Sequence, residues 1–452
     1  MRRPLAALAV GLGTTLAVAL GVILAAAPQA LAAATQALAA APHALAGKGG
    51  VGIAAPARTG GGAGSAALTR VLRLGMRQAG VFSGAEVADL STGQTLYAHH
   101  ANVARLPASV EKLFTTSTAL TRFGAAARLT TSLLGTGHQA GSTWRGTLYL
   151  RGGGDPTFGT AAFNHSRYGT GASVQKLVAG LQAQGITALS GPIVADASRF
   201  DADAGTPATG NRLSTEVEGG LSALSFDRDW ADSDGAILYR NPALAAGDGL
   251  VSALRAGGIH VRRHEPVRTG RTPAGAEALA SVSSPSMSTL VALTNTPSDN
   301  FFAETLLKDI GARYGGAGTT AAGAAVVRGE MRSAFDIAPR LNDGSGLSRY
   351  DRTTPAQVIS LLSQMRDIPA FTGSLAVTGL TGTLVYENRH TYAQGRCTGK
   401  TGTLHDVSNV VGYCRARDGH LLAYAFLMNG VNPDAAHPIQ DRMQVAVARY
   451  DG

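Results

Sequence analysis

Three short motifs in this chain carry side chains that can perform acyl transfer at a serine. They read Ser-Val-Glu-Lys at 109–112, Ser-Asp-Asn at 298–300 and Lys-Thr-Gly at 400–402. Each motif alone arises by chance in many proteins. The chain holds only five lysines, however, and two of them stand at motif positions. The three motifs together therefore predict one catalytic site.

The first motif pairs a nucleophile with a base. A serine hydroxyl is a weak nucleophile until an adjacent base takes its proton. Pro107 is expected to open a helix that runs to about Phe123, because proline is tolerated in a first helical turn. On that helix Ser109 and Lys112 share a face, and burial together with a second cation, Lys400, would lower the pKa of Lys112. An exposed helix lysine is the alternative interpretation.

The second motif stands where a loop enters a predicted helix. Ser298 could serve only as the N-cap of that helix. Beside Ser109 and Lys400, however, the Ser298 hydroxyl can relay a proton to a leaving amine. The amide of Asn300 can then hold a carbonyl of the substrate.

The third motif lies on a predicted strand over 397–403. Lys400 and Thr401 would grip a substrate carboxylate at the strand edge, and Gly402 would let the substrate backbone approach closely. The segment 395–401 is one residue short of a phosphate-binding loop. It lies on a strand and not before a helix, so nucleotide binding is rejected.

The elements around the motifs predict an α+β fold in which helices surround an antiparallel sheet. Helices are expected over 67–78, 107–123, 172–182, 286–293, 298–313, 319–335, 354–365 and 438–450, and strands over 84–90, 94–97, 147–150, 191–196, 397–403, 407–414 and 421–427. Short strands and Gly-rich turns dominate 131–284, which indicates a large β-rich insertion. The catalytic domain would then comprise 67–130 and 285–452.

The N-terminus has the pattern of an export signal. Two arginines follow Met1, an apolar run covers 5–26, and Ala30-Leu31-Ala32 offers a small-residue cleavage site. Residues 1–32 are therefore expected to be a signal peptide, or a single membrane anchor if they are retained, and the Ala/Gly-rich segment 33–66 a tether. The folded part would act outside the cytoplasm, as a secreted, periplasmic or cell-wall protein.

Composition narrows the remaining possibilities. The 452 residues are 45% hydrophobic, which supports full globular cores. The net charge of +9 would suit an anionic wall polymer or lipid surface, but arginine is spread along the chain and adjacent basic residues occur only as isolated pairs, which favours an ordinary solvated surface. We find no nucleic-acid motif, no cofactor motif and no His-Glu-x-x-His zinc pattern.

Cys397 and Cys414 would face each other across a hairpin and could form a disulfide, with two free thiols as the alternative.

Several boxes together resemble the penicillin-recognising serine acyltransferases, and most closely the type-4, class C low-molecular-mass penicillin-binding proteins. Besides the three motifs, the boxes are Leu106–Leu113, Gly152–Pro156, Asp196–Asp201, Asp299–Glu304, Asp343–Arg349 and Lys400–Leu404. The 189 positions between Ser109 and Ser298 also match the large insertion of this branch. The resemblance covers about residue 67 to the C-terminus.

The resemblance implies a D-Ala-D-Ala carboxypeptidase/endopeptidase that cleaves peptidoglycan stem peptides through an acyl-enzyme on Ser109. Lys112 would be the base and Ser298 the proton relay, while Asn300 contacts the peptide. Lys400 and Thr401 would bind the terminal carboxylate, and the backbone N–H groups of Ser109 and Thr403 would form the oxyanion hole. β-Lactams would acylate Ser109 as substrate mimics.

Two alternatives remain open. A serine β-lactamase of class A would need a deacylating Glu in a Glu-x-x-x-Asn arrangement, and the chain has no such spacing. A catalytically silent wall-binding protein would be free to lose site residues, since groups that act as a unit lose their value together. The complete set of motif residues argues against this second alternative.

Overall fold

A six-stranded antiparallel sheet carries the third motif. The computed structural model describes residues 63–261 and 266–452. The strands of this sheet lie in the order β10-β11-β12-β13-β1-β2. They are β1 (Gly84–Asp89), β2 (Gln94–His99), β10 (Ala376–Val377), β11 (Cys397–Leu404), β12 (Val407–Arg415) and β13 (Leu421–Asn429).

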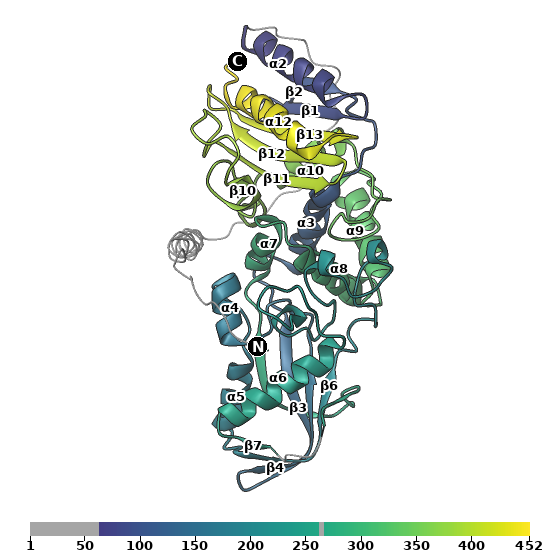
Figure 1. Cartoon of the computed structure of the whole chain (residues 1–452), viewed down its shortest axis with the longest axis vertical. Coiled ribbons are helices and arrows are strands. Elements are labelled where there is room, and N and C mark those ends of the chain that lie inside the picture. The colour runs from purple at the N-terminus through teal and green to yellow at the C-terminus, as the bar shows by residue number, and fades with distance from the viewer. Residues whose placement is uncertain (1–62, 262–265) are drawn as a thin grey trace, which may run out of the picture. The chain divides into compact units, whose positions relative to one another are not determined.

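Helices cover both faces of this sheet. On one face α2 (Ala63–Ala79) and α12 (Pro433–Ala448) lie side by side (Figure 1) and share a core with the sheet. Leu68, Leu72 and Met76 form the buried stripe of α2 at helical spacing. Because both faces are covered, β12 and β13 are buried along almost their whole length rather than at every second residue.

The other face packs on the helices that bear the first two motifs. A 3₁₀ turn, η1 (Ala108–Glu111), leads directly into α3, and the surrounding helices share one large buried cluster with the sheet. The helices are α3 (Lys112–Phe123), α7 (Met287–Asn295), α8 (Asn300–Tyr314), α9 (Thr320–Phe335), α10 (Pro355–Met365) and α11 (Pro369–Thr372).

A second, mixed sheet lies between α3 and α7 in the sequence. Its order is β7-β5-β4-β3-β9, with β6 pairing to β4 and β8 to β6. The strands are β3 (Thr130–Ala140), β4 (Thr143–Arg151), β5 (Ala188–Ser190), β6 (Ile193–Asp196), β7 (His260–Val261), β8 (Arg268–Thr269) and β9 (Glu277–Ser283). Together with α4 (Ala161–Tyr168), α5 (Val174–Ala183) and α6 (Pro242–Ala256), they enclose a core of their own.

The predicted α+β class is confirmed. The helices and strands expected around the three motifs are present with small changes in their ends; α2, for example, begins at Ala63 rather than at residue 67. Helices α4 and α6 and the long strand β3 were not expected. The predicted export signal and nearly all of the predicted tether lie outside the described residues.

Candidate active site

Ser109 and Lys112 meet at the junction of η1 and α3. The Lys112 Nζ donates a hydrogen bond of 2.9 Å to the Ser109 Oγ. The turn η1 begins with Ala108, the residue before Ser109. Ala108 has a left-handed φ of 46° that an L-residue rarely adopts. Such a conformation persists only where surrounding contacts hold it. The first-motif pairing predicted from helical spacing is therefore present.

Lys112 is fully buried and bonded only to neutral acceptors. Besides Ser109, its Nζ donates to the Asn300 Oδ1 at 2.6 Å and to the Ser345 carbonyl at 2.8 Å. Burial lowers the pKa of Lys112 to about 8, although the carboxyl groups of Glu218, Asp343, Glu304 and Asp299 oppose this shift. With a pKa this close to neutrality, Lys112 can accept the proton of Ser109.

The second motif places two side chains at the start of α8. Asp299, not Ser298, caps this helix, since its carboxylate accepts from the Phe302 N–H at 2.9 Å. The capping interpretation of Ser298 is therefore wrong. Ser298 adopts a φ of 69° and its Oγ accepts a 2.6 Å hydrogen bond from the Lys400 Nζ.

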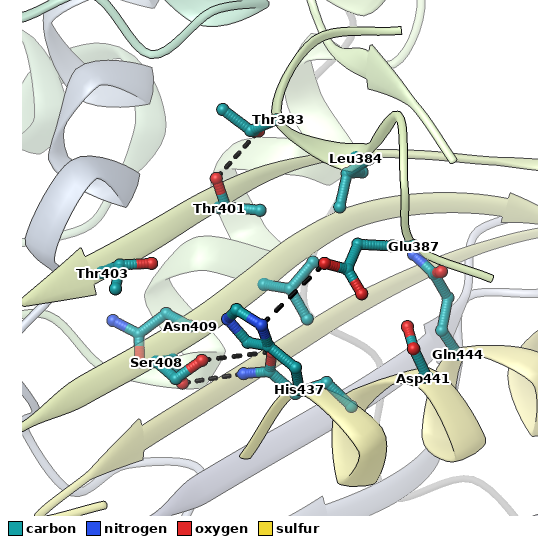
Figure 2. Close-up of a pocket in the computed structure, with 12 residues that line it drawn as sticks. Thr383, Leu384, Glu387, Thr401, Thr403, Ser408, Asn409, His437, Asp441 and Gln444 are labelled. Atoms are coloured by element: carbon teal, nitrogen blue, oxygen red, sulfur yellow. Dashed lines mark hydrogen bonds and ion pairs between the residues drawn. The ribbon is translucent and has the colours of Figure 1, made fainter. Parts of the chain in front are cut away.

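The third motif lies on a strand edge that is open to a ligand. β10 pairs with Thr398 and Gly399 only, and the Cys397 carbonyl accepts from the Thr378 N–H on that same side. Because backbone groups alternate between the two edges of an antiparallel strand, the N–H groups of Thr401 and Thr403 face this edge. The Thr401 Oγ1 donates to the Thr383 Oγ1 at 2.8 Å (Figure 2).

Gly402 makes close contact with the nucleophile turn. A Cβ at this position would meet the Pro107 carbonyl at 2.5 Å and the Ser109 nitrogen at 3.2 Å. The sequence predicted that this glycine leaves room for a substrate. In the structure the space on that face of β11 holds the turn with Ser109, so the glycine allows the first and third motifs to pack together.

Lys400 is fully buried, as Lys112 is. Its Nζ donates to the Ser298 Oγ and, at 2.8 Å, to the Thr401 carbonyl. Burial and the nearby Lys112 lower the pKa of Lys400 well below its usual value. Burial is thus the larger cause of the lowered pKa at both lysines, and at Lys400 the charge of Lys112 adds to it.

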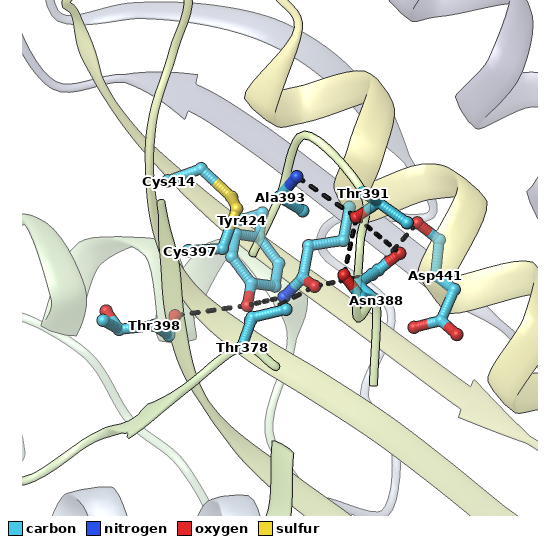
Figure 3. Close-up of a disulfide and its surroundings, with 10 residues drawn as sticks. Thr378, Asn388, Thr391, Ala393, Cys397, Thr398, Cys414, Tyr424 and Asp441 are labelled. Atoms are coloured by element: carbon cyan, nitrogen blue, oxygen red, sulfur yellow. Dashed lines mark hydrogen bonds between the residues drawn. A yellow bond between two sulfur atoms is a disulfide. The ribbon is translucent and has the colours of Figure 1, made fainter. Parts of the chain in front are cut away.

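A disulfide braces the strand of the third motif. Cys397 and Cys414 occupy paired positions on β11 and β12, with their Cα atoms 4.1 Å apart. Figure 3 shows the bond beside the buried Tyr424, whose hydroxyl donates to the Thr398 carbonyl at 3.2 Å. The disulfide expected from the hairpin is confirmed, three positions before Lys400.

Replacing both cysteines by alanine is expected to lower the free energy of unfolding by about 2–4 kcal/mol, since the bond constrains the unfolded chain. Cys397 and Cys414 are 17 positions apart. Urea unfolding of the double variant and of the reduced wild-type protein should give similar losses. A loss below about 0.5 kcal/mol in both would contradict a stabilising disulfide.

The second-sheet region contributes residues to the site that no sequence motif revealed. The Glu218 Oε2 accepts from the Asn300 N–H at 2.8 Å, and the Glu216 carbonyl accepts from the Asn300 Nδ2 at 2.8 Å. Arg228 forms a two-point ion pair with Asp299. These contacts hold Asn300 with its Oδ1 toward Lys112.

The Asp343–Arg349 box positions one of the three hydrogen-bond acceptors of Lys112. The Glu304 Oε1 accepts from the backbone N–H groups of Gly344 and Ser345 at 2.9 and 2.8 Å. Asp343 accepts from the Gly346 N–H at 2.7 Å. These buried carboxyl groups fix the loop so that the Ser345 carbonyl points at the Lys112 Nζ. The box was recognised from the sequence, but this role was not.

Two other boxes attach the second sheet to α8 instead of lining the site. Arg199, after β6, donates to the buried Asp309 at 2.8 Å, and a Cβ on Gly154 would meet that carboxyl at 2.2 Å. Lys308 pairs with Asp201. The Gly-Asp-Pro box therefore packs against the helix that begins with Asn300.

The predicted site residues are gathered in one place. Ser109, Lys112 and Asn300 form one hydrogen-bonded group, Lys400, Ser298 and Thr401 form a second, and Gly402 packs the two against each other. Thr403 lies exposed at the end of the same strand edge. A serine activated by a buried lysine, beside a second lysine and an open strand edge, can form an acyl-enzyme. Across the described residues no group of three His, Cys, Asp or Glu side chains could hold a metal ion.

Known proteins resemble this chain in sequence. The profile of the D-Ala-D-Ala carboxypeptidase 3 (S13) family matches residues 67–215 and 214–450. The D-alanyl-D-alanine carboxypeptidase of Actinomadura sp. (strain R39) is 30% identical over 447 residues, which are 82% of this chain and 82% of that protein. Carboxypeptidase DacB of Mycolicibacterium smegmatis is 28% identical over 375 residues, covering 77% and 76% of the two chains.

The fold also has solved counterparts. The crystal structure of penicillin binding protein 4 from Haemophilus influenzae superposes with a TM-score of 0.71 at 19% identity, covering 84% of this chain and 99% of that one. The same protein complexed with a β-lactam gives a TM-score of 0.66. The family match extends over all three motifs. The chain therefore belongs to the D-Ala-D-Ala carboxypeptidase 3 (S13) family, which confirms its resemblance to the type-4, class C penicillin-binding proteins.

Proposed function

We propose that this protein is a serine D-Ala-D-Ala carboxypeptidase that acts on peptidoglycan stem peptides and cleaves their cross-links by the same route. The observation that carries the proposal is the 2.9 Å hydrogen bond between the Ser109 Oγ and the buried Lys112 Nζ. The family membership, with its named D-Ala-D-Ala carboxypeptidase relative, supports the substrate class. Action on the wall lies outside the cytoplasm.

The first half of the reaction forms an ester on Ser109. Neutral Lys112 takes the hydroxyl proton while the Oγ attacks the carbonyl between two D-alanines. The oxyanion accepts hydrogen bonds from the backbone N–H groups of Ser109 and Thr403, and Asn300 holds the peptide. When the C–N bond breaks, the proton that Lys112 took passes through Ser298 to the departing amine, which leaves Lys112 neutral again, and Lys400 and Thr401 hold the carboxylate of the leaving residue.

The second half releases the acyl group. Water attacks the ester carbonyl, Lys112 takes its proton, and the Ser109 oxygen recovers a proton as it leaves. A cross-link joins a D-alanine carbonyl to the amine of another stem, so it can follow the same two steps. A β-lactam would acylate Ser109 as well, as the β-lactam complex of the Haemophilus influenzae protein with this fold makes reasonable.

Digestion of purified peptidoglycan followed by mass analysis tests the proposal. Release of single alanines reports carboxypeptidase activity, and loss of cross-linked dimers reports endopeptidase activity. Rapid repeated hydrolysis of penicillin would favour a β-lactamase instead, whereas a long-lived covalent adduct supports the proposal. Failure of a fluorescent penicillin to label the protein would favour a silent wall-binding protein.

The rate should depend on the protonation of Lys112. Only neutral Lys112 can act as base, and its pKa lies at about 8. Below that pH the neutral fraction falls about tenfold per unit, so kcat/KM for D-Ala release should rise with pH and level off above it. Initial rates measured between pH 5.5 and pH 9 check this profile. A profile that stays flat across this range would exclude Lys112 as the titrating base.

The remaining predictions concern the parts of the chain. The separate sheet and core of β3–β9 support an insertion at 131–284 within a catalytic domain made of 67–130 and 285–452. Within 63–261 and 266–452 no helix has the length and apolar character needed to cross a membrane. An export signal or anchor at 1–32 and a tether after it stay predictions of the sequence.

A further inference from the structure

A cavity of about 180 Å³ opens on the face of β11 that bears Thr401 and Thr403 (Figure 2). It lies between β11, the short turn η5 (Gly382–Leu384) and α12. None of the residues Ser109, Lys112, Ser298, Asn300 and Lys400 lines it. Its lining includes Thr383, Leu384, Glu387, Thr401, Thr403 and Asp441.

The two ends of the cavity differ in chemistry. The threonine hydroxyls of β11 and η5 stand at one end, where Thr401 and Thr383 are hydrogen-bonded. At the other end are the carboxyl groups of Glu387 and Asp441. Burial and the neighbouring Glu387 carboxyl raise the pKa of Asp441 to about 7, while Arg442 opposes the shift. The two acids thus repel each other and would gain from a cation between them.

Only a histidine and a neighbouring arginine stand near this acidic end in the described part of the chain. His437 is the nearest basic side chain that lines the cavity, and its Nδ1 lies 3.9 Å from the Glu387 Oε1, beyond hydrogen-bonding distance. The described residues offer no metal-binding cluster here or elsewhere. The carboxyl groups of Glu387 and Asp441, which both line the cavity, are complementary to an organic cation such as an amine.

The cavity is placed to receive part of the leaving residue. In the proposed reaction the carboxylate of that residue binds at Lys400 and Thr401, with Thr403 adjacent. The side chain of an amino acid is attached to the same α-carbon as its carboxylate. Because Thr401 and Thr403 line the cavity, it offers space for that side chain next to the carboxylate, whereas the acyl half would lie toward Ser109 and Asn300.

We infer that this cavity binds the side chain of the residue whose amine leaves, and that it selects D-amino acids with an extended side chain ending in an amine. The inference rests on the proposed function. One water molecule needs only about 10–15 Å³ of such space, so the methyl group of D-alanine leaves most of the cavity empty. A longer side chain fills it and reaches Glu387 and Asp441. The protein would then cleave bonds to extended residues in preference to terminal D-alanine.

Synthetic substrates test this inference directly. N-acylated tripeptides ending in D-Ala-D-Xaa, with D-alanine, D-norleucine, D-lysine or D-glutamate last, separate length from charge. We expect kcat/KM to be about fivefold higher for D-lysine than for D-norleucine, since a partly exposed ion pair contributes up to about 1 kcal/mol. D-Glutamate should be the poorest of the three extended residues.

Substitutions at the acidic end identify the residues responsible. In Glu387→Gln/Asp441→Asn the ratio of D-lysine to D-norleucine rates should fall toward one. Asp434→Asn is the matched control, because Asp434 lies exposed in the first turn of the same helix and does not line the cavity. It should keep the wild-type ratio. If the double variant still releases D-alanine, it is folded. If it does not, the single variant Glu387→Gln is used for the same comparison of D-lysine and D-norleucine rates.

The possible outcomes distinguish failure of the cavity assignment from failure of the proposed function. Hydrolysis of the D-alanine substrate with no preference among the four leaving residues would overturn the cavity assignment and leave the carboxypeptidase intact. A preference for D-lysine that persists in the acidic variants would also overturn it. Failure to hydrolyse any of the four substrates would overturn the proposed function and the inference with it.

Discussion

Ser109→Ala is expected to abolish covalent labelling by a fluorescent penicillin and to lower kcat for D-Ala release by about 10⁵–10⁶. The Ser109 Oγ is the only oxygen that accepts from the Lys112 Nζ and can also be acylated; the other two acceptors are the Asn300 amide and the Ser345 carbonyl. Labelling followed by gel fluorescence and mass measurement of the adduct checks the result.

A serine of α3, the helix that follows the Ser109 turn, supplies the control. Ser117→Ala removes a buried hydroxyl that bonds only to the Phe114 carbonyl, at 3.1 Å. This variant should label like the wild-type protein. Ser109→Ala should unfold close to the wild-type temperature, because Ser109 is only partly buried. Ser117→Ala should lose no more than its one hydrogen bond, about 1 kcal/mol. Persistent labelling in Ser109→Ala would refute the assignment of the nucleophile.

Arg228→Ala is expected to destabilise the protein by about 3–5 kcal/mol, since it leaves a partly buried carboxylate without its partner. The Arg228 side chain is 6% exposed, pairs with Asp299 through both nitrogens and lies 5.0 Å from the centre of the Phe301 ring. Its Nε also donates to the Glu218 carbonyl at 2.9 Å. Urea unfolding measures the loss.

The same substitution should slow acylation where the variant is still folded. Arg228 fixes both Asp299, the cap of α8, and the segment with Glu218 that holds the Asn300 N–H. Without it, Asn300 can turn away from Lys112, and the acylation rate should fall by about tenfold or more. Penicillin acylation rates at low temperature, where the variant is folded, measure this effect.

A neighbouring arginine is the matched control. Arg167 lies over the same Trp230 ring as Arg228, 4.8 Å from its centre, but is exposed and pairs with no carboxylate. Arg167→Ala should change the free energy of unfolding by less than about 1 kcal/mol and leave acylation unchanged. Equal effects of the two substitutions would contradict a specific role for Arg228.

The weakest sequence predictions fall in the second sheet, for a physical reason. β3 and β4 hold glycines where side chains would signal a strand: Gly135 leaves room for the Trp144 ring, and Gly137 faces Gly146. Helix α6 is rich in Ala and Gly, so its apolar stripe is faint. Around the motifs, by contrast, large apolar residues recur with the period of the element, and the predicted ends are close to those observed.

The sequence by itself determined which chemistry is present. Side-chain type and local spacing are encoded in the chain, so Ser109 and Lys112 could be paired on one helix face, and the family boxes could be recognised. Tertiary structure alone decided what surrounds that pair. The Ser345 carbonyl reaches Lys112 across 233 positions, and Arg228 reaches Asp299 across 71. No local pattern encodes such contacts, because they depend on how distant elements pack; the burial that lowers the pKa of Lys112 arises from the same packing.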